Sequence, residues 1–252
     1  MNADSPSARA PVRIAGPEDF AAAFDVSRET IARLGIYERL LRQWQKAVNL
    51  VAPGTLDDAW HRHFADSAQL LALAPSARTW VDLGSGAGFP GLVVAILAAD
   101  PASPTARSAH AGEGARRARP RFTLIESHAR KCAFLHEVVR QTGLSAGVAV
   151  EILSIRIEEA ATHANVERPD VVSARALAPL DKLIALAAPL FAPHTVGLFL
   201  KGREVAAELE AARRAWSFEL ELVQSCTDRE GRIVVIRDLA PQPAPKSEGL
   251  KP

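Results

Sequence analysis

The chain has 252 residues, of which 48% are hydrophobic, and this suffices for one α/β domain with a small extension. Its net charge of +1 excludes a global attraction to nucleic acid, so any basic binding face must be local. Two distant cysteines without metal-ligand spacing, no membrane-length apolar run and no apolar signal core together predict a cytosolic protein without disulfides.

The first part of the chain is predicted to contain a disordered extension and a helical cap. Residues 1–17 are rich in Ala, Pro and Ser, a composition typical of disorder. Ser27 can cap a first amphipathic helix, and a second helix is expected from about Thr55 to Pro75. We therefore assign residues 18–78 to a small helical cap before the first strand.

Three polar side chains of the second helix allow two interpretations. His61, His63 and Asp66 are possible metal ligands, but three ligands without a fourth nearby in sequence make a weak site. Alternatively, His63 and Asp66, three residues apart, pair with one another on one helix face. We favour the pair and predict no metal site.

The rest of the chain is organised around the stretch from Trp80 to Leu97. Trp80 to Leu83 is predicted to be a short buried strand, the glycines after it a turn, and Pro90 the first residue of a helix. Such a junction exposes backbone N–H groups and little side-chain bulk. A nucleotide-like cofactor is therefore expected to lie against it, at the carboxyl end of a parallel strand.

Two cofactors compete for this loop. Gly86 to Gly91 satisfies the GxGxxG fingerprint of dinucleotide-binding proteins, in which the first glycine normally follows the strand directly. Here Asp82 and Gly84 come first, and the arrangement Asp-x-Gly-x-Gly-x-Gly resembles the first motif of S-adenosylmethionine-dependent methyltransferases. A carboxylate at the strand end suits the amino-acid part of that cofactor and would repel a pyrophosphate. The motif favours a methyltransferase over a dehydrogenase, with a purely structural turn as the third possibility.

After the loop, strands and helices alternate in the way that builds a parallel sheet. The predicted segments are strands at 122–125, 148–153, 171–175 and 196–200, and helices at 129–141, 179–190 and 204–215. Residues 218–223 and 232–236 are predicted to be an antiparallel hairpin, which favours a methyltransferase because a dehydrogenase usually continues with further βα units. The domain is expected to span 79–240, with a disordered tail at 241–252.

Residues 102–120 form a run rich in Pro, Ala, Gly and Arg without apolar periodicity. We favour a solvated, flexible insertion, because such a composition cannot bury a core. The alternative is a basic arm whose arginines touch phosphates.

Further motifs accompany the glycine loop in a fixed order. They are residues 41–50, His63-Phe-Ala-Asp66-Ser67, Phe89-Pro90-Gly91, Glu126-Ser127, Arg130-Lys131, Phe134-Leu135, Arg156-Ile157-Glu158, Ser173-Ala174-Arg175-Ala176 and Leu200-Lys201-Gly202. Together they closely resemble the bacterial ribosomal RNA small subunit methyltransferase G family, also called glucose-inhibited division protein B, from about Arg28 to Ile236. The arginine-rich run and the long amino-terminal extension depart from the family but interrupt no motif, so they put only the RNA-facing surface in doubt.

The resemblance implies a Rossmann-like class I methyltransferase fold, with a mostly parallel seven-stranded sheet, a C-terminal antiparallel hairpin and an N-terminal helical cap. It also implies methyl transfer from S-adenosylmethionine to N7 of one guanine in the decoding region of 16S ribosomal RNA, as naked RNA or in the 30S subunit. Guanine N7 carries an unprotonated lone pair at neutral pH, so this reaction needs alignment rather than a general base.

Position in the sheet and the resemblance together suggest which residues meet the cofactor. Glu126, at the end of the second strand, is expected to accept hydrogen bonds from ribose hydroxyls, and Ile157 or Glu158 to meet the adenine. The expected cofactor-binding residues are Asp82, Gly84, Gly86, Gly88, Phe89, Glu126, Ile157, Glu158 and Arg175. The alternatives are a helix-capping role for Glu126 and an exposed ion pair for Glu158.

A second set of polar residues is expected to face the RNA. Arg175 and Lys201 end the fourth and fifth strands, near the crevice where the strand order reverses. A guanidinium that donated to N7 would block the nucleophile, so contact with phosphate or O6 is the more consistent role. Arg156 is expected to act similarly, and Asn49 and His63 to close over the crevice from the cap. The alternative for all of them is an ordinary surface or capping role.

Two other function classes stay open on the sequence alone. One is an NAD(P)-binding oxidoreductase, and the other is a non-catalytic RNA-binding protein of the ribosome that keeps the fold. Binding of S-adenosylmethionine distinguishes a methyltransferase from both alternatives, because neither of them needs that cofactor.

Overall fold

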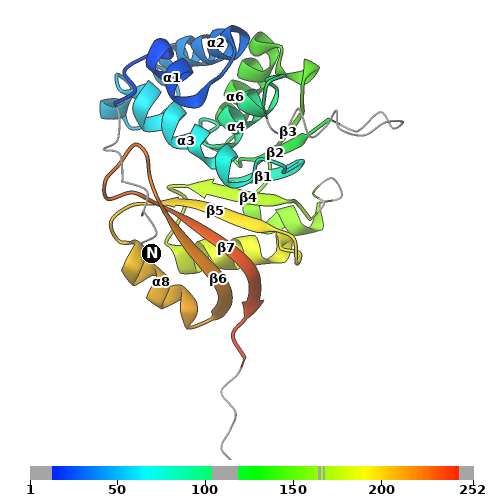
Figure 1. Ribbon diagram of the computed structural model, residues 1–252. Coiled ribbons are helices and arrows are strands. Elements are labelled where there is room, and N and C mark those ends of the chain that lie inside the picture. Colours follow the sequence, from blue (N-terminus) through cyan, green and yellow to red (C-terminus); the bar gives the residue numbers. More distant parts are fainter. Residues whose placement is uncertain (1–12, 104–118, 164–165, 167, 244–252) are drawn as a thin grey trace, which may run out of the picture.

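Seven strands form one sheet in the order β3-β2-β1-β4-β5-β7-β6. The computed structural model describes residues 13–103, 119–163, 166 and 168–243 (Figure 1). The strands are β1 (Thr79–Leu83), β2 (Arg121–Ile125), β3 (Ala149–Leu153), β4 (Val171–Arg175), β5 (Val196–Lys201), β6 (Trp216–Gln224) and β7 (Arg232–Pro241). The first five strands pair in parallel, and β7 lies antiparallel between β5 and β6. This order confirms the predicted seven-stranded, mostly parallel sheet with a C-terminal hairpin.

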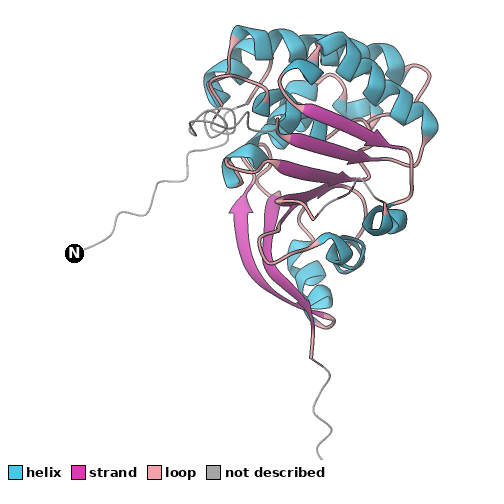
Figure 2. Ribbon diagram, turned by 90° about the vertical axis from the view of Figure 1, so that its right-hand side faces the viewer, coloured by secondary structure: helices cyan, strands magenta, loops and turns pink. Residues whose placement is uncertain are grey.

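Helices cover both faces of the sheet (Figure 2), because successive side chains of each strand point to opposite sides. Trp80 and Phe122 belong to one buried cluster, whereas Val81, the next residue after Trp80, belongs to the other. The helices over the first face are α1 (Pro17–Phe24), α2 (Arg28–Gln45), α4 (Gly91–Ala98) and α6 (Ala129–Thr142), and over the second α7 (Leu180–Ala187) and α8 (Val205–Arg213). Each face thus has its own apolar core.

The helical cap begins earlier than predicted. Residues 1–12 of the expected disordered extension lie outside the described residues, but Ile14 is buried and its N–H donates to His61 Nδ1 at 3.3 Å. Helix α1 follows directly, and Phe20 is fully buried against the rings of Phe24 and Trp60, with centroids 4.6 and 5.6 Å away. The burial of Ile14 and the aromatic packing of Phe20 therefore place residues 14–24 against the cap.

Helix α2 starts as predicted, with the Ser27 side chain accepting a hydrogen bond from the Thr30 N–H at 3.2 Å. The single second helix predicted for the cap is wrong. Its place is taken by a short 3-10 turn η1 (Pro53–Thr55), a π-helical turn η2 (Trp60–Ala65), α3 (Asp66–Ala68) and a 3-10 turn η3 (Gln69–Leu73). The Asp66 N–H bonds to the carbonyl of His61, five residues earlier, which is the hydrogen-bond spacing of a π-helix.

The later elements lie close to their predicted bounds. Helix α6 ends where Gly143 adopts a left-handed conformation with φ of 61°, as the sequence predicts. Short 3-10 turns add η4 (Leu144–Ala146), η5 (Ile157–Thr162) and η6 (Ala188–Leu190). The hairpin strands are longer than predicted, since β7 continues to Pro241.

Two predicted segments are largely beyond what the structure describes. Most of the arginine-rich run, residues 104–118, and the end of the tail, residues 244–252, lie outside the described residues. Within the described part of the chain, no helix is long and apolar enough to cross a membrane.

Candidate active site

The carboxyl end of β1 leads into a loop whose glycines have left-handed backbone conformations. The φ angles are 63° at Gly84, 57° at Gly86 and 90° at Gly88. A Cβ at Gly84 would come within 2.6 Å of Leu177 Cδ1, and one at Gly88 within 2.5 Å of the Tyr37 hydroxyl oxygen. At Gly86 the nearest atom would be 3.8 Å away. A side chain at Gly88 would clash with Tyr37 and one at Gly84 would displace the end of the Leu177 side chain, whereas a side chain at Gly86 would meet almost no protein atoms.

Asp82 lies beneath this loop and not in a cleft. Its side chain is fully buried, and Oδ1 accepts a hydrogen bond from Ser173 Oγ at 2.6 Å. Trp80 Nε1 donates to the same hydroxyl at 2.8 Å. Burial raises the pKa of Asp82 to about 6, and the hydrogen bond from Ser173 opposes this rise. Asp82 thus ties β1 to β4 under the loop.

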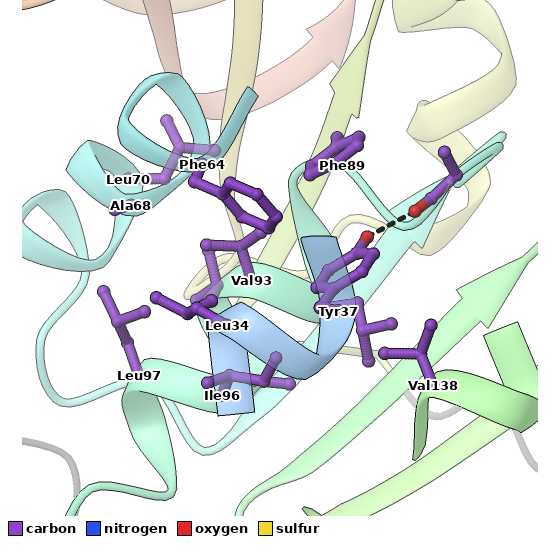
Figure 3. Packing of buried hydrophobic residues seen from close by; sticks show 14 of the residues in the cluster. Leu34, Tyr37, Phe64, Ala68, Leu70, Phe89, Val93, Ile96, Leu97 and Val138 are labelled. Atoms are coloured by element: carbon purple, nitrogen blue, oxygen red, sulfur yellow. Dashed lines mark hydrogen bonds between the residues drawn. The ribbon is translucent and has the colours of Figure 1, made fainter. Parts of the chain in front are cut away.

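Tyr37 of α2 supports the loop from the cap side. Its hydroxyl donates to the carbonyl of Ala87, and its ring stacks on Phe89 with the centroids 5.3 Å apart and the planes 8° from parallel (Figure 3). Phe64 meets both rings edge-on. The aromatic cluster therefore fixes Phe89 and the end of the glycine loop against the cap.

Glu126 directly follows β2 and holds the loop from the other side. Its Oε2 accepts from the Gly86 N–H at 2.9 Å, and its Oε1 accepts from the His128 N–H, which precedes α6, at 2.7 Å. Each carboxylate oxygen has a second lone pair, so Glu126 retains acceptors for a ligand's hydroxyl groups.

Two adjoining cavities open at this edge of the sheet, with volumes of about 540 and 370 Å³. The larger lies between the glycine loop, the cap and the β6–β7 turn, and the smaller lies between the glycine loop and the segment after β3. The residues that line both are Gly84, Gly86, Lys131, Arg175 and Ala176. The cavities therefore form one continuous space, and from here on we call it the cleft.

The cleft brings together most of the residues proposed from the sequence. Phe89, His63 and Lys201 line the larger cavity. The predicted residues in the smaller cavity are Glu126, Arg156, Ile157 and Glu158. Gly88, Asp82 and the exposed Asn49 line neither cavity, although Leu50, next to Asn49, lines the larger one.

Arg175 ends β4 at the junction of the two cavities, and its guanidinium is held on several sides. Its Nη2 donates to His63 Nδ1 and its Nη1 to the Arg62 carbonyl, both at 3.0 Å, while Nη1 lies 3.5 Å from Asp66 Oδ2. Its Cζ stands 5.0 Å from the centroid of the Phe89 ring, a cation–π distance. Burial lowers the pKa of Arg175, and the Asp66 carboxylate opposes that shift.

His63 is a neutral hydrogen-bond acceptor toward Arg175. Burial, followed by the charges of Arg175 and Arg62, lowers the pKa of His63 to about 3. A guanidinium can only donate, so Nδ1 carries no proton, and Nε2–H donates to Thr55 Oγ1 at 2.8 Å. The predicted pairing of His63 with Asp66 is wrong, because both contact Arg175 instead. Among the described residues, no group of His, Cys, Asp and Glu side chains is arranged to hold a metal ion.

Lys201 lines the cleft but its ammonium is bound to protein groups. Nζ lies 2.5 Å from Glu208 Oε2 and donates to the Ala178 carbonyl at 2.8 Å. The same Glu208 oxygen accepts from the Leu180 N–H at 2.7 Å. This arrangement joins the end of β5 to the starts of α7 and α8, so Lys201 shapes the cleft wall.

Sequence reasoning did not identify some cleft residues as site residues. Lys131 of α6 lines both cavities, and its position in the Arg130-Lys131 motif is a signal that points to it. From the β6–β7 turn, Ser225, Thr227, Asp228 and Arg232 line the larger cavity. No local pattern marks this turn, because it reaches the cleft only through the insertion of β7 beside β5.

The arrangement suits a nucleoside and a second ligand side by side. The smaller cavity offers bare backbone and carboxylates for hydroxyl and amino groups, and the larger offers a guanidinium beside an apolar wall.

Comparisons with known proteins identify the family to which the chain is similar. The GidB family model, described as rRNA small subunit methyltransferase G, matches residues 30–234. A protein named ribosomal RNA small subunit methyltransferase G from Parvibaculum lavamentivorans is 50% identical over 230 residues, covering 90% of this chain and 91% of its own length. One of the same name from Rhodospirillum centenum is 49% identical over 227 residues, with coverages of 89% and 91%. The solved structure of a methyltransferase from Geobacter sulfurreducens matches the fold with a TM-score of 0.51 at 14% identity, over 82% of this chain and 88% of that one.

Proposed function

The chain belongs to the rRNA small subunit methyltransferase G family, and from this premise we propose that it methylates N7 of a specific guanine in the decoding region of 16S rRNA. It is a methyltransferase whose methyl donor is S-adenosylmethionine. The observation that carries the assignment is the continuous cleft, in which a glycine loop and Glu126 adjoin a second cavity at Arg175.

The cleft residues fit S-adenosylmethionine. Gly86 presents bare backbone to the cleft, and any side chain there would occupy the space that the cofactor needs. Glu126 retains acceptors for ribose hydroxyls. Ile157 and Glu158 line the smaller cavity, where the adenine would lie. Phe89, Gly84 and Arg175 adjoin the methionine side, while Asp82 lies beneath the loop and Gly88 lets the loop pack against Tyr37. When bound, the cofactor supplies an electrophilic methyl group on a sulfonium sulfur.

The remaining task of the protein is to align the guanine. N7 needs no deprotonation, so the cleft requires no general base, and the neutral His63 supplies no proton at physiological pH. Proximity and orientation alone contribute several kcal/mol, about 7–11 in favourable intramolecular cases. The larger cavity would hold the base against the apolar wall formed by Leu50 and Val51, within reach of Arg175.

The RNA-facing residues divide by their surroundings. We assign Arg175 to a phosphate or to O6, because donation to N7 would occupy the nucleophilic lone pair. Arg156 is exposed beside the smaller cavity and suits a phosphate, and Asn49 is exposed at the rim of the larger one. Lys201 contributes by holding the cleft wall through Glu208. Because its substrate is ribosomal RNA, we propose that the enzyme works in the cytoplasm, on naked RNA or on the 30S particle.

Methyl transfer to defined RNA substrates tests this function. Wild-type protein is incubated with radiolabelled S-adenosylmethionine and unmodified 16S rRNA, 30S subunits or 70S ribosomes in parallel, and the modified atom is mapped by the strand cleavage specific to 7-methylguanine. We expect label at a single guanine of the decoding region in at least one substrate. Binding of the RNA with no transfer to any of the three would favour a non-catalytic binder, and label at another atom would overturn the assignment.

A further inference from the structure

Two cap residues, His63 and Asp66, contact the Arg175 guanidinium at the junction of the two cavities. We propose that His63 and Asp66 are positioning residues, which hold the Arg175 guanidinium against Phe89 so that its remaining N–H groups face the cleft. The inference rests on the proposed function for its kinetic test, but the geometry that carries it is independent of the substrate.

The guanidinium of Arg175 has more donors than the protein uses. Arginine presents five N–H groups in a planar fork. The described acceptors are His63 Nδ1, the Arg62 carbonyl and Asp66 Oδ2, and the Phe89 ring covers one face of the plane. Because Arg175 lines both cavities, the donors left over are available to a ligand in the cleft.

His63 fits this role only as a neutral imidazole with one tautomer. Its ring stacks on Phe89 at 5.0 Å and 23°, next to the guanidinium on the same ring. Thr55 Oγ1 donates to the Ala52 carbonyl at 2.7 Å, so it is free to accept from His63 Nε2–H at 2.8 Å. This directs the Nδ1 lone pair toward Arg175. Arg175, Arg62 and Asp66 are the charged groups around the ring, and the two cations oppose its protonation.

Asp66 links three parts of the chain at one carboxylate. Its Oδ1 accepts from Thr227 Oγ1 at 2.8 Å, from Gln69 Nε2 at 3.0 Å and from Ser225 Oγ at 3.4 Å, while Oδ2 faces Arg175. Thr227 and Ser225 belong to the β6–β7 turn, which forms one wall of the larger cavity. Asp66 thus fastens both this wall and Arg175 to the cap. The cap is therefore part of the catalytic geometry and not merely a cover.

A double-mutant cycle tests whether His63 acts through Arg175. Single-turnover methyl transfer is measured for wild type, His63→Phe, Arg175→Ala and the double variant. His63→Phe keeps an aromatic ring on Phe89 but removes the acceptor, and we expect about a tenfold slower rate, equivalent to roughly 1.4 kcal/mol. In the Arg175→Ala background, we expect the same change to cost less than about twofold. Equal losses in both backgrounds would overturn the inference, since His63 would then act independently.

Conservative variants separate positioning from folding. His63→Asn keeps an acceptor near the position of Nδ1 and should recover part of the rate lost in His63→Phe. Asp66→Asn keeps an oxygen for the Thr227 hydroxyl but removes the charge facing Arg175, and should slow transfer with less effect on KM for RNA. Asp57→Asn, an exposed carboxylate paired with Arg42 outside the cleft, is the matched control and should leave the rate unchanged. If His63→Asn is as slow as His63→Phe while both remain folded, the acceptor role fails.

Nitrogen-15 NMR of the imidazole tests the geometry without activity. We expect His63 to be the neutral Nε2–H tautomer in the wild type, with the Nδ1 resonance shifted by its hydrogen bond from Arg175, and to lose that Nδ1 shift in Arg175→Ala. A protonated imidazole at pH 7, an Nδ1–H tautomer in the wild type, or an unchanged Nδ1 resonance in Arg175→Ala would overturn the positioning role. If the wild type transfers no methyl group to any RNA, the proposed function fails on its own, and this spectrum still decides the inference.

Discussion

At the residue scale, the glycine loop gives the sharpest prediction. Gly86→Val places a branched side chain at a left-handed position that opens into the cleft, so it should abolish measurable S-adenosylmethionine binding by calorimetry while the protein stays folded. Gly35→Ala, in α2 with no atom within 4 Å of the added Cβ, is the matched control and should bind like wild type. Unchanged affinity in folded Gly86→Val would show that the cofactor lies elsewhere.

Arg175 tests the RNA-facing side of the cleft. Arg175→Ala removes a charged donor and leaves Asp66 without its cation, so single-turnover transfer should fall by roughly 10- to 100-fold, the equivalent of one charged hydrogen bond. Arg175→Lys should recover only part, because an ammonium lacks the planar fork. Cofactor affinity measured on the same preparations shows whether Arg175 also touches S-adenosylmethionine. Wild-type rates in Arg175→Ala would remove this residue from the active site.

Asp82 predicts a particular dependence of stability on pH. Its folded pKa is raised from the ordinary 3.8 to about 6, so its stabilising contribution is complete below pH 3.8 and is lost as the pH rises through 6. Asp82→Asn does not titrate. The free energy of unfolding of Asp82→Asn relative to wild type should therefore rise by roughly 1 kcal/mol between pH 5 and pH 7.5.

Urea unfolding of both proteins across this range measures the difference. The opposite contribution of His63, whose lowered pKa costs stability as the pH falls below 6.5, is common to both proteins and cancels. A difference that does not change with pH would mean that Asp82 is charged at pH 5 in the folded protein.

At the scale of elements, local patterns predicted most of the sheet. Strands such as β1 and β4 are short apolar runs between clear turn residues, and α6 has both a periodic face and a terminal glycine. The cap was harder to predict, because α1 is ordered by the long-range packing of Phe20, and the π-helical turn η2 has the same local composition as an α-helix. Elements stabilised by neighbours distant in sequence are the ones that local periodicity misses.

Deletion tests the two interpretations of the arginine-rich run. The described residues beside it are packed, since the Pro120 carbonyl accepts from the Ala149 N–H at 2.8 Å and Ser103 Oγ donates to the Ala98 carbonyl at 3.2 Å. Replacing residues 104–118 with a short Gly/Ser linker should therefore leave the melting temperature and cofactor affinity nearly unchanged. RNA affinity measured on the same protein decides between a plain insertion and a basic arm. A large loss of both stability and cofactor binding would contradict each interpretation.

At the scale of the whole molecule, the site was predictable where topology alone assembles it. Parallel strands bring their carboxyl ends to one edge, so Glu126, directly after β2, and Arg175, the last residue of β4, could be predicted from their positions. The side to which Asp82 points, and the return of the β6–β7 turn to the cleft, depend on how the layers pack. The same packing joins the cap to the sheet through Asp66, which no local spacing reveals.

Single-turnover methyl transfer to RNA in which 7-deazaguanine replaces guanine at the mapped position tests directly whether N7 accepts the methyl group. This base keeps O6 and the Watson–Crick edge but has carbon in place of N7, so it offers no lone pair there. We predict that the enzyme binds this RNA and S-adenosylmethionine as well as it binds the unmodified pair, and transfers no methyl group. Methyl transfer to the 7-deazaguanine RNA at the unmodified rate would contradict N7 as the acceptor and with it the account of the cleft given above.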